Sequence, residues 1–362
     1  MQIGIYAGFM RKARRLCLLA LLGANGATAA ALPAGPAGEA ATAPGQVRLG
    51  AEDAAALRGR GYTAALLMHT SSEFSRALCA GAGAVFKELG IKVVAQTDAE
   101  MDPKKQRSDL ETVLALKPDI IVSLVIDPVS GAVAFRQALR QGAKLVFISN
   151  APQGFRHGRD YAGIVTDDLP GMGAAAAKLL ADSIGGSGEV AVIHHAANYF
   201  VTNQRDAAVR RELARYPAIR VVAAPGIANP NDGEVVAAAI LTQHPRVKAI
   251  YAPWDLIAEG VTAALRAAGR RDVKVVTMDL GAANALDMVK RGNMAGIVSD
   301  MPYDMGRSLA TMGALAMLGR PTPAFVTYAA TPVTPANLAE QWPLALRRPA
   351  PAALRKALEA RQ

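Results

Sequence analysis

Short apolar runs of strand length alternate with helical patterns along most of this chain. The first run, 62–68, is followed by a polar turn at 69–73 and a second run at 91–95. Between them, apolar residues recur at helical spacing from Phe74 to Leu89, until Gly90 ends the predicted helix. Runs of this length predict buried strands. Because the crossover between parallel strands is right-handed, the strand–helix–strand unit predicts one layer of a parallel sheet.

The same unit recurs in two series, which predicts two lobes. The other candidate strands are 120–124, 145–148 and 163–165 in the first series, and 190–194, 221–224, 249–252, 273–278 and 296–298 in the second. Strands that alternate with helices indicate an α/β fold. With 362 residues, of which 51% are hydrophobic, the chain can bury two cores of ordinary domain size. We therefore expect two Rossmann-like lobes with parallel sheets.

Polar or aromatic clusters stand at the carboxyl end of nearly every predicted strand. Open α/β sheets bind ligands at this edge, so the recurrence in both series predicts a binding cleft. One such cluster by itself is better explained as a solvated loop or a helix cap, and Asp127, Asp167 and Ser183 read easily as caps or turn residues. The candidate ligand-binding residues are Ser71, Ser72, Glu73, Phe74, Asp127, Asn150, Asn203, Arg205, Asn229, Trp254, Asp255, Asp279 and Asp300. His69 and Thr70 belong to the same predicted turn as the first of these.

The first 49 residues read as a signal peptide and a spacer. Four cations, Arg11, Lys12, Arg14 and Arg15, precede an apolar run at 16–22 and small residues that fit a cleavage site. The run is too short for a transmembrane helix. Residues 32–44 are rich in Ala, Gly and Pro and read as a disordered spacer. Export would leave Cys79 without a partner, and we expect it to be buried on the first helix.

Charge and motifs exclude other classes of function. The formal net charge is +10, and removing the four signal-peptide cations lowers it to +6, with no basic block in the body that suggests a nucleic-acid partner. The GGSG at 185–188 lacks the lysine of a phosphate-binding loop, and the adjacent His194 and His195 point to opposite faces of a strand, which suits no zinc site. We expect no catalytic residue, no cofactor and no metal, and therefore no enzyme.

The motifs in order resemble a known family. They are Ser71-Ser72-Glu73-Phe74, KPDIIV at 117–122 before Asp127-Pro128, VFISN at 146–150, NQR at 203–205, LTQHPRVKAIYAPWD at 241–255 and VVTMD at 275–279. Over about 61–331 the chain resembles type I periplasmic solute-binding proteins of the ribose and galactose group, the extracytoplasmic subunits of sugar ABC importers.

The resemblance implies a hinged receptor. Two lobes, 50–164 with 301–328 and 165–300 with 329–347, would be joined by three crossings near Ile164, Ser299 and Thr327, followed by a tail at 348–362. A small ligand would be enclosed between them as the hinge closes. The implied partner is an ABC permease in the inner membrane, the location is the periplasm, and we expect a monomer. A repressor with the same core would need a helix-turn-helix in place of the signal peptide.

The resemblance also assigns roles to single residues. Arg205 matches the arginine that donates to sugar hydroxyls, and Asp279 the carboxylate that accepts from them. Phe74 matches an aromatic that covers the sugar ring, but it fits core packing of the first helix equally well. If the ligand is their partner, Arg205→Ala and Asp279→Ala should leave the melting temperature without ligand nearly normal. Asn150-Ala151 replaces a charged pair of the family and Trp254 replaces a binding Asn, so ribose itself is not the expected ligand.

These departures leave several ligands open. A sugar, polyol, cyclitol or similar small polar compound fits the resemblance. The acids Asp255, Asp279 and Asp300 beside Trp254 also allow an amino or quaternary ammonium ligand, whereas Arg205 opposes a strongly cationic one. A sensor that presents its ligand to a membrane receptor is a further alternative.

Overall fold

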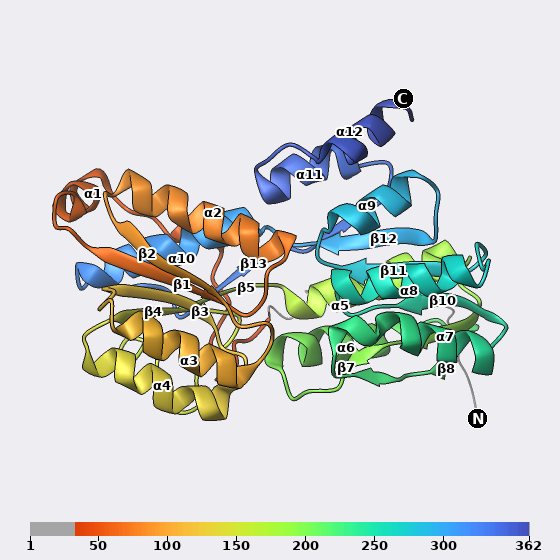
Figure 1. The fold of residues 1–362 in the computed structure, drawn as a ribbon, viewed down its shortest axis with the longest axis horizontal. Helices are drawn as coiled ribbons and strands as arrows, with labels where there is room; N and C mark the ends of the chain where they lie inside the picture. The colour runs from red at the N-terminus through yellow and green to blue at the C-terminus, as the bar shows by residue number, and fades with distance from the viewer. Residues whose placement is uncertain (1–32, 362) are drawn as a thin grey trace, which may run out of the picture. The chain divides into compact units, whose positions relative to one another are not determined.

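Two six-stranded sheets form the framework of residues 33–361, the part of the chain that this computed structural model describes (Figure 1). The predicted signal peptide lies outside the described residues. The first sheet has the strand order β13-β5-β4-β3-β1-β2, all parallel. Its strands are β1 (Thr63–Met68), β2 (Lys92–Asp98), β3 (Ile120–Leu124), β4 (Lys144–Ile148), β5 (Ile164–Asp167) and β13 (Phe325–Tyr328).

The second sheet repeats this plan with one reversed edge strand. Its order is β14-β12-β11-β10-β6-β8, and only β14 runs antiparallel to its neighbour. The strands are β6 (Gly188–Val192), β8 (Ile219–Ala223), β10 (Val247–Tyr251), β11 (Lys274–Met278), β12 (Met294–Ser299) and β14 (Thr331–Val333). The short strands β7 (His194–His195) and β9 (Gly226–Ile227) pair separately. The α/β fold with two parallel-sheet lobes is confirmed.

Helices cover both faces of each sheet and pack their apolar faces against it. On the first sheet, α2 (Glu73–Glu88) and α10 (Pro302–Met317) share one core, and α3 (Pro103–Leu114) and α4 (Pro128–Arg140) share the other. On the second sheet, α5 (Leu169–Ser183) and α6 (Phe200–Leu213) cover one face. The opposite core is built from α7 (Gly233–Gln243), α8 (Asp255–Ala267), α9 (Ala282–Val289), α11 (Leu338–Leu346) and α12 (Ala352–Glu359). Cys79 is buried on α2, as predicted.

The chain passes between the two sheets three times. It leaves the first sheet after β5, returns after β12, and leaves again between β13 and β14. Consequently α10 follows the second sheet in sequence but packs against α2 of the first (Figure 1). The carboxyl ends of β1, β5 and β11 and the first turns of α2, α6 and α8 supply residues to a common cavity.

Glycines bring the helix pairs into unusually close contact. A Cβ on Gly81 of α2 would lie 1.9 Å from the carbonyl oxygen of Tyr303 at the start of α10. A Cβ on Gly306 of α10 would lie 2.0 Å from the carbonyl oxygen of Leu78. On the second sheet, a Cβ on Gly173 of α5 would lie 2.3 Å from the carbonyl oxygen of Arg205 on α6. Only glycine permits this approach of two backbones.

The interpretation of residues 32–44 as a disordered spacer is wrong for the described part of that segment. Thr42 donates its backbone N–H to Phe325 at 2.8 Å and accepts from Thr327 at 3.1 Å, so the segment pairs with the open edge of β13. The hydroxyl of Tyr161 donates to Glu39 at 3.0 Å. The exposed N–H and C=O groups of an edge strand explain this docking. A short helix, α1 (Ala51–Leu57), follows. Within residues 33–361, no helix combines the length and apolar character that a membrane crossing requires.

Candidate functional site

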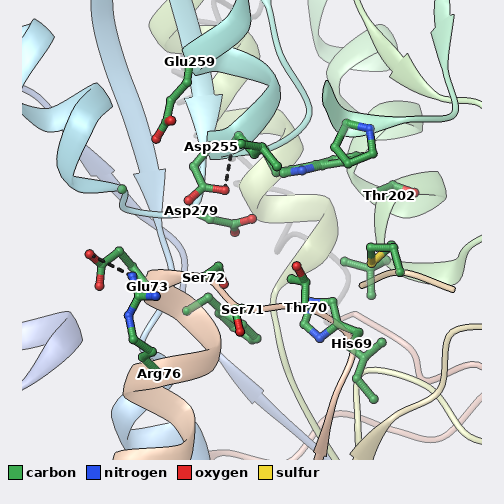
Figure 2. A pocket seen from close by; sticks show the side chains of 18 of the residues that line it. His69, Thr70, Ser71, Ser72, Glu73, Arg76, Thr202, Asp255, Glu259 and Asp279 are labelled. Atoms are coloured by element: carbon green, nitrogen blue, oxygen red, sulfur yellow. Dashed lines mark hydrogen bonds and ion pairs between the residues drawn. The ribbon is translucent and has the colours of Figure 1, made fainter. Parts of the chain in front are cut away.

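A cavity of about 370 Å³ lies between residues of the two sheets. This volume is at the lower end of the range of about 300–1,000 Å³ that is typical of pockets for small molecules. Figure 2 shows Thr70, Ser71, Ser72 and Glu73 on one side and Asp255, Asp279 and Glu259 on the other. The predicted edge of the sheets is therefore hollow and lined by polar side chains.

The turn after β1 builds the first side of the cavity. Ser72 caps α2 by accepting the backbone N–H of Ser75 at 3.2 Å, which fixes the turn at the N-terminus of the helix. His69 stands at the end of β1, and burial lowers the pKa of its imidazole to about 4. The ring is therefore neutral at pH 7. Its Nδ1 atom has no hydrogen-bond partner among the described residues, and the ring lies edge-on to Phe74 at 6.1 Å.

An ion group connects the second sheet with the end of β5. The Nη1 atom of Arg205 lies 3.1 Å from Oδ1 of Asp279, and its Nη2 atom lies 3.7 Å from Oδ2 of Asp167. Burial favours the neutral form of Arg205, but the surrounding carboxylates Asp279, Asp167 and Asp300 raise the pKa of this guanidinium. Burial also raises the pKa of Asp167, against the attraction of Arg205. One guanidinium thus stabilises several buried carboxylates.

Two polar atoms of this group have no protein partner. Asp167 is 2% exposed and Arg205 is 5% exposed, and both line the cavity. Within the described part of the chain, Oδ1 of Asp167 and Nε of Arg205 make no hydrogen bond. Buried polar atoms are nearly always paired with protein or water, so these two are available for a ligand or for water molecules that a ligand replaces.

A second acidic group lies on the first turns of α8. Asp255 and Glu259 are one helical turn apart and both line the cavity. Burial raises the pKa of Asp255 to about 7, and the like charges of Asp279 and Glu259 add to this effect. Burial likewise raises the pKa of Glu259. Among residues 33–361, no Lys, Arg or His forms an ion pair with either carboxylate.

Aromatic rings form part of the wall on the side of the second sheet. Trp254 is half-buried and lines the cavity beside Tyr199. The ring of His195 stands edge-on to both, at 5.1 Å from Trp254 and 5.9 Å from Tyr199, and its Nδ1 atom lies 3.1 Å from the hydroxyl oxygen of Thr202. These contacts hold an indole beside the acids of α8.

An ion pair from the C-terminal segment reaches the opposite side of the cavity. Glu73 pairs with Arg76 at 3.2 Å and also contacts the guanidinium of Arg348, which follows α11. Next to it, Arg347 pairs with Asp304 of α10 at 3.1 Å. The segment after α11 thus connects a helix of the second sheet with the first turns of α2 and α10. The charge of Glu73 is thereby neutralised.

The structure brings eight of the predicted residues to the cavity. They are Ser71, Ser72, Glu73, Phe74, Arg205, Trp254, Asp255 and Asp279. Five others lie outside its lining. Asp127 caps α4, Asn229 accepts the N–H of Asn231, and Asn203 is exposed and donates to Asn198. Asn150 is buried and donates to the carbonyl of Val125, and Asp300 is buried beside the ion group, where burial raises its pKa. Four of these five thus have local structural partners, whereas Oδ2 of Asp300 has no hydrogen-bond partner among the described residues.

Several lining residues were not among the predicted ones. Asp167 read as a cap, but Asp168 is the residue that caps α5, by accepting the N–H of Gly171 at 2.9 Å. Arg76 and Glu259 lie three and four residues after predicted acids on a helix, so helical spacing could have indicated both. Thr202 lies on the face of α6 that carries Arg205. No pattern in the sequence indicated that Tyr199 would line the cavity.

A cavity at the polar carboxyl ends of two parallel sheets, between which the chain passes three times, is typical of a solute-binding protein. A family described as a periplasmic binding protein domain matches residues 64–321, and the chain belongs to this family. Over 267 residues, 74% of this chain and 88% of the relative, it is 26% identical to the ribose import binding protein RbsB of Salmonella typhimurium.

Solved structures agree with this assignment. A carbohydrate transporter solute-binding protein from Agrobacterium radiobacter, in complex with D-arabinose, is 25% identical with a TM-score of 0.72 and covers 80% of this chain and 100% of its own. A periplasmic solute-binding protein of an ABC transporter from Actinobacillus succinogenes, with bound D-allose, is 25% identical with a TM-score of 0.68 and covers 75% of this chain and 97% of its own. Both are similar over nearly their whole length.

Proposed function

We propose that this protein is the extracytoplasmic substrate-binding subunit of an ABC importer and captures a sugar, polyol or similar small polar ligand. The observation that carries the proposal is the cavity, which both sheets line with hydroxyl, carboxylate and guanidinium groups beside aromatic rings. Such groups bind hydroxyls by donating to them and accepting from them, while a ring covers the apolar face of a sugar. Membership of the periplasmic binding protein family and similarity to proteins with bound D-arabinose and D-allose support the same ligand class.

The ligand would act by shifting an equilibrium between open and closed forms. In this proposal the lobes are 50–164 with 301–328 and 165–300 with 329–347, and they move about the three passages of the chain between the sheets. Only the closed form contacts the ligand from both sides, so binding favours closure. An ABC permease in the inner membrane would recognise the closed form. The protein would work as a periplasmic monomer after export, without catalysing a reaction.

A ligand screen followed by scattering tests the proposal. A compound present at about 100 times its dissociation constant stabilises the folded protein by roughly 2.7 kcal/mol, which a thermal shift detects. Pentoses, hexoses, alditols and cyclitols form the panel, with nucleotides and amino acids as comparison classes. A hit from the sugar or polyol group should decrease the radius of gyration in small-angle X-ray scattering. Stabilisation only by the comparison classes, or no compaction at saturation, would contradict the proposal.

A further inference from the structure

The charges that line the cavity do not balance. The acids of the lining are Glu73, Asp167, Asp255, Glu259 and Asp279, whereas Arg76 and Arg205 are its only arginines or lysines within the described residues. Glu73 is paired with Arg76 and also with Arg348, and Arg205 is shared between Asp167 and Asp279. Asp255 and Glu259 form no ion pair among the described residues, although Arg76 faces Asp255. A neutral ligand would cover these half-buried carboxylates without supplying a countercharge.

We propose that the ligand carries a protonated amino group on a polyhydroxylated skeleton, and that this ammonium binds between Asp255, Glu259 and Asp279. The inference rests on the proposed function, because it concerns the same cavity and names the chemical class of its ligand. An ammonium has three N–H donors and no acceptor, which matches a group of carboxylates from more than one element. The carboxylates come from α8 and from the residue that follows β11.

The geometry of α8 supports the ammonium position. Asp255 and Glu259 lie on one face of the helix at a spacing where like charges destabilise it. The groups that face Asp255 are Asp279 after β11, Glu259 on its own helix and, from α2, Arg76. Two of these three are acids, and together with burial they raise the pKa of Asp255. An ammonium between the carboxylates would reverse this effect by favouring the ionised form.

Asp167 gives an independent indication of a ligand that donates hydrogen bonds. Its Oδ1 atom has no partner among residues 33–361, although the side chain is 2% exposed and lines the cavity. A carboxylate oxygen only accepts hydrogen bonds when it is ionised, so its missing partner is an N–H or O–H group. The cavity thus offers an unused acceptor on Asp167, in addition to the carboxylates of α8 that form no ion pair.

The hydroxyl groups on the other side of the cavity favour an amino polyol over a simple amine. Thr70, Ser71 and Ser72 present hydroxyls on the side opposite Asp255 and Asp279 (Figure 2). Hydroxyls bind other hydroxyls, and a compound with an amine alone would leave them unused. The indole of Trp254 beside the acids also favours a cation. A quaternary ammonium fits less well, since it has no N–H to donate to the carboxylates.

Matched ligands test this inference by calorimetry. The probes are glucosamine, galactosamine and mannosamine, each compared with its parent hexose and with its N-acetyl derivative, and glucamine compared with sorbitol. At pH 7.5 at least one amine should bind about ten to a hundredfold more tightly than its neutral counterparts, as expected for charge-assisted hydrogen bonds. Asp255→Asn and Glu259→Gln should each abolish most of this preference. Asp182→Asn, on an exposed ion pair with Lys178, serves as the control and should preserve it.

The results of this calorimetry can contradict the ammonium site without contradicting the proposed function. If a neutral sugar or alditol binds as tightly as its amine, the ammonium site is contradicted while the proposed function stands. If the preference for the amine survives in both Asp255→Asn and Glu259→Gln, the ammonium lies elsewhere and the assignment is overturned. If no probe binds, neutral or amino, both the inference and the sugar or polyol class fail. Melting temperatures without ligand show that the variants fold.

Discussion

Arg205 and Asp279 contact each other directly, with Nη1 of the guanidinium 3.1 Å from Oδ1 of the carboxylate. The sequence predicted both as ligand-binding residues whose partner is the ligand, with little effect on the unliganded protein. The structure instead pairs them in the absence of ligand and adds Asp167 to the same guanidinium. Both residues therefore have a structural role in addition to the proposed contact with ligand.

Removing the guanidinium should destabilise the protein before any ligand is added. Arg205→Ala leaves the buried carboxylates of Asp167 and Asp279 without their cation, which costs on the order of 3–5 kcal/mol. Urea denaturation of the unliganded protein measures this loss. Asp182→Ala breaks only an exposed pair and should change the free energy of unfolding by less than about 1 kcal/mol. A normal stability of Arg205→Ala would show that the ion group does not support the fold.

Two glycines of α2 provide a matched pair for the helix contact. Gly81→Ala places a Cβ 1.9 Å from the backbone of α10, so the helices must separate and we expect a loss of several kcal/mol. Gly83 lies two residues further along, and its Cβ would have no neighbour within 4 Å. Gly83→Ala should therefore stabilise the helix by about 0.5–1 kcal/mol. Thermal denaturation of the two variants gives the comparison, and equal melting temperatures would argue against the close packing of α2 and α10.

Tryptophan fluorescence should report ligand binding through a single residue. The protein has two tryptophans, of which Trp254 lines the cavity and Trp342 of α11 is completely buried in the core of the second sheet. Addition of a ligand found in the screen should change the emission of the wild-type protein. Trp254→Phe should abolish this change and weaken binding, whereas Trp342→Phe should retain the change. A signal that persists in Trp254→Phe would place the ligand away from the indole.

The stability of the unliganded protein should fall as the pH rises from about 6.5 to 8. The pKa of Asp255 is about 7 in the folded state, against 3.8 for an ordinary aspartate, so in this range the folded protein holds a proton that the unfolded chain has released. Stability that depends on such a proton decreases as the pH passes the folded-state pKa. Burial also lowers the pKa of His69, His194 and His195, which contributes in the opposite direction. These contributions end about one pH unit above the ordinary histidine pKa of about 6.5, where the unfolded histidines are neutral.

Asp255→Asn isolates this effect. Its melting temperature should change less between pH 6.5 and 8 than that of the wild-type protein, because the amide does not titrate. Asp167, whose pKa burial also raises, keeps part of the dependence in the variant. Parallel curves for the two proteins over this range would mean that Asp255 is ionised in the folded state throughout.

The sequence determined the fold well because its signals are local and repeated. All ten predicted strands exist with ends shifted by at most a few residues, for example β3 at 120–124 and β11 at 274–278. Most are short apolar runs that are buried on both faces, as a parallel sheet between two layers of helices requires, whereas the edge strands β2 and β8 are partly exposed. The edge strands β13 and β14 were missed, since they are short and follow no comparable run.

The site was predicted less completely, in part because residues 203–205 were interpreted as the polar end of a strand, whereas they lie on the helix α6. Asn203 and Arg205 were taken as one polar cluster, but α6 turns by about 100° per residue, so Arg205 faces the cavity while Asn203 is exposed. Of the neighbours Asp167 and Asp168, the first lines the cavity and the second caps α5. Predicting which does which requires the end of β5 to be known to within one residue. The contact of Arg348 with Glu73 joins parts of the chain that are far apart in sequence, and no local pattern indicates it.

The placement of α10 sets the order in which the two halves can fold. The core beneath α2 needs Met305, Leu309 and Met312 of α10, which leave the ribosome only after the whole second sheet except β14. The second sheet takes its other strands from one continuous stretch, 188–299, and its core against α5 and α6 is local, whereas its other core also needs α11 and α12. We expect pulsed hydrogen exchange during refolding to protect β10 and β11 before β1. The half that is synthesised first therefore stays incomplete through the synthesis of nearly the whole second sheet, and until α10 arrives the apolar face of α2 remains open to chaperones and to aggregation.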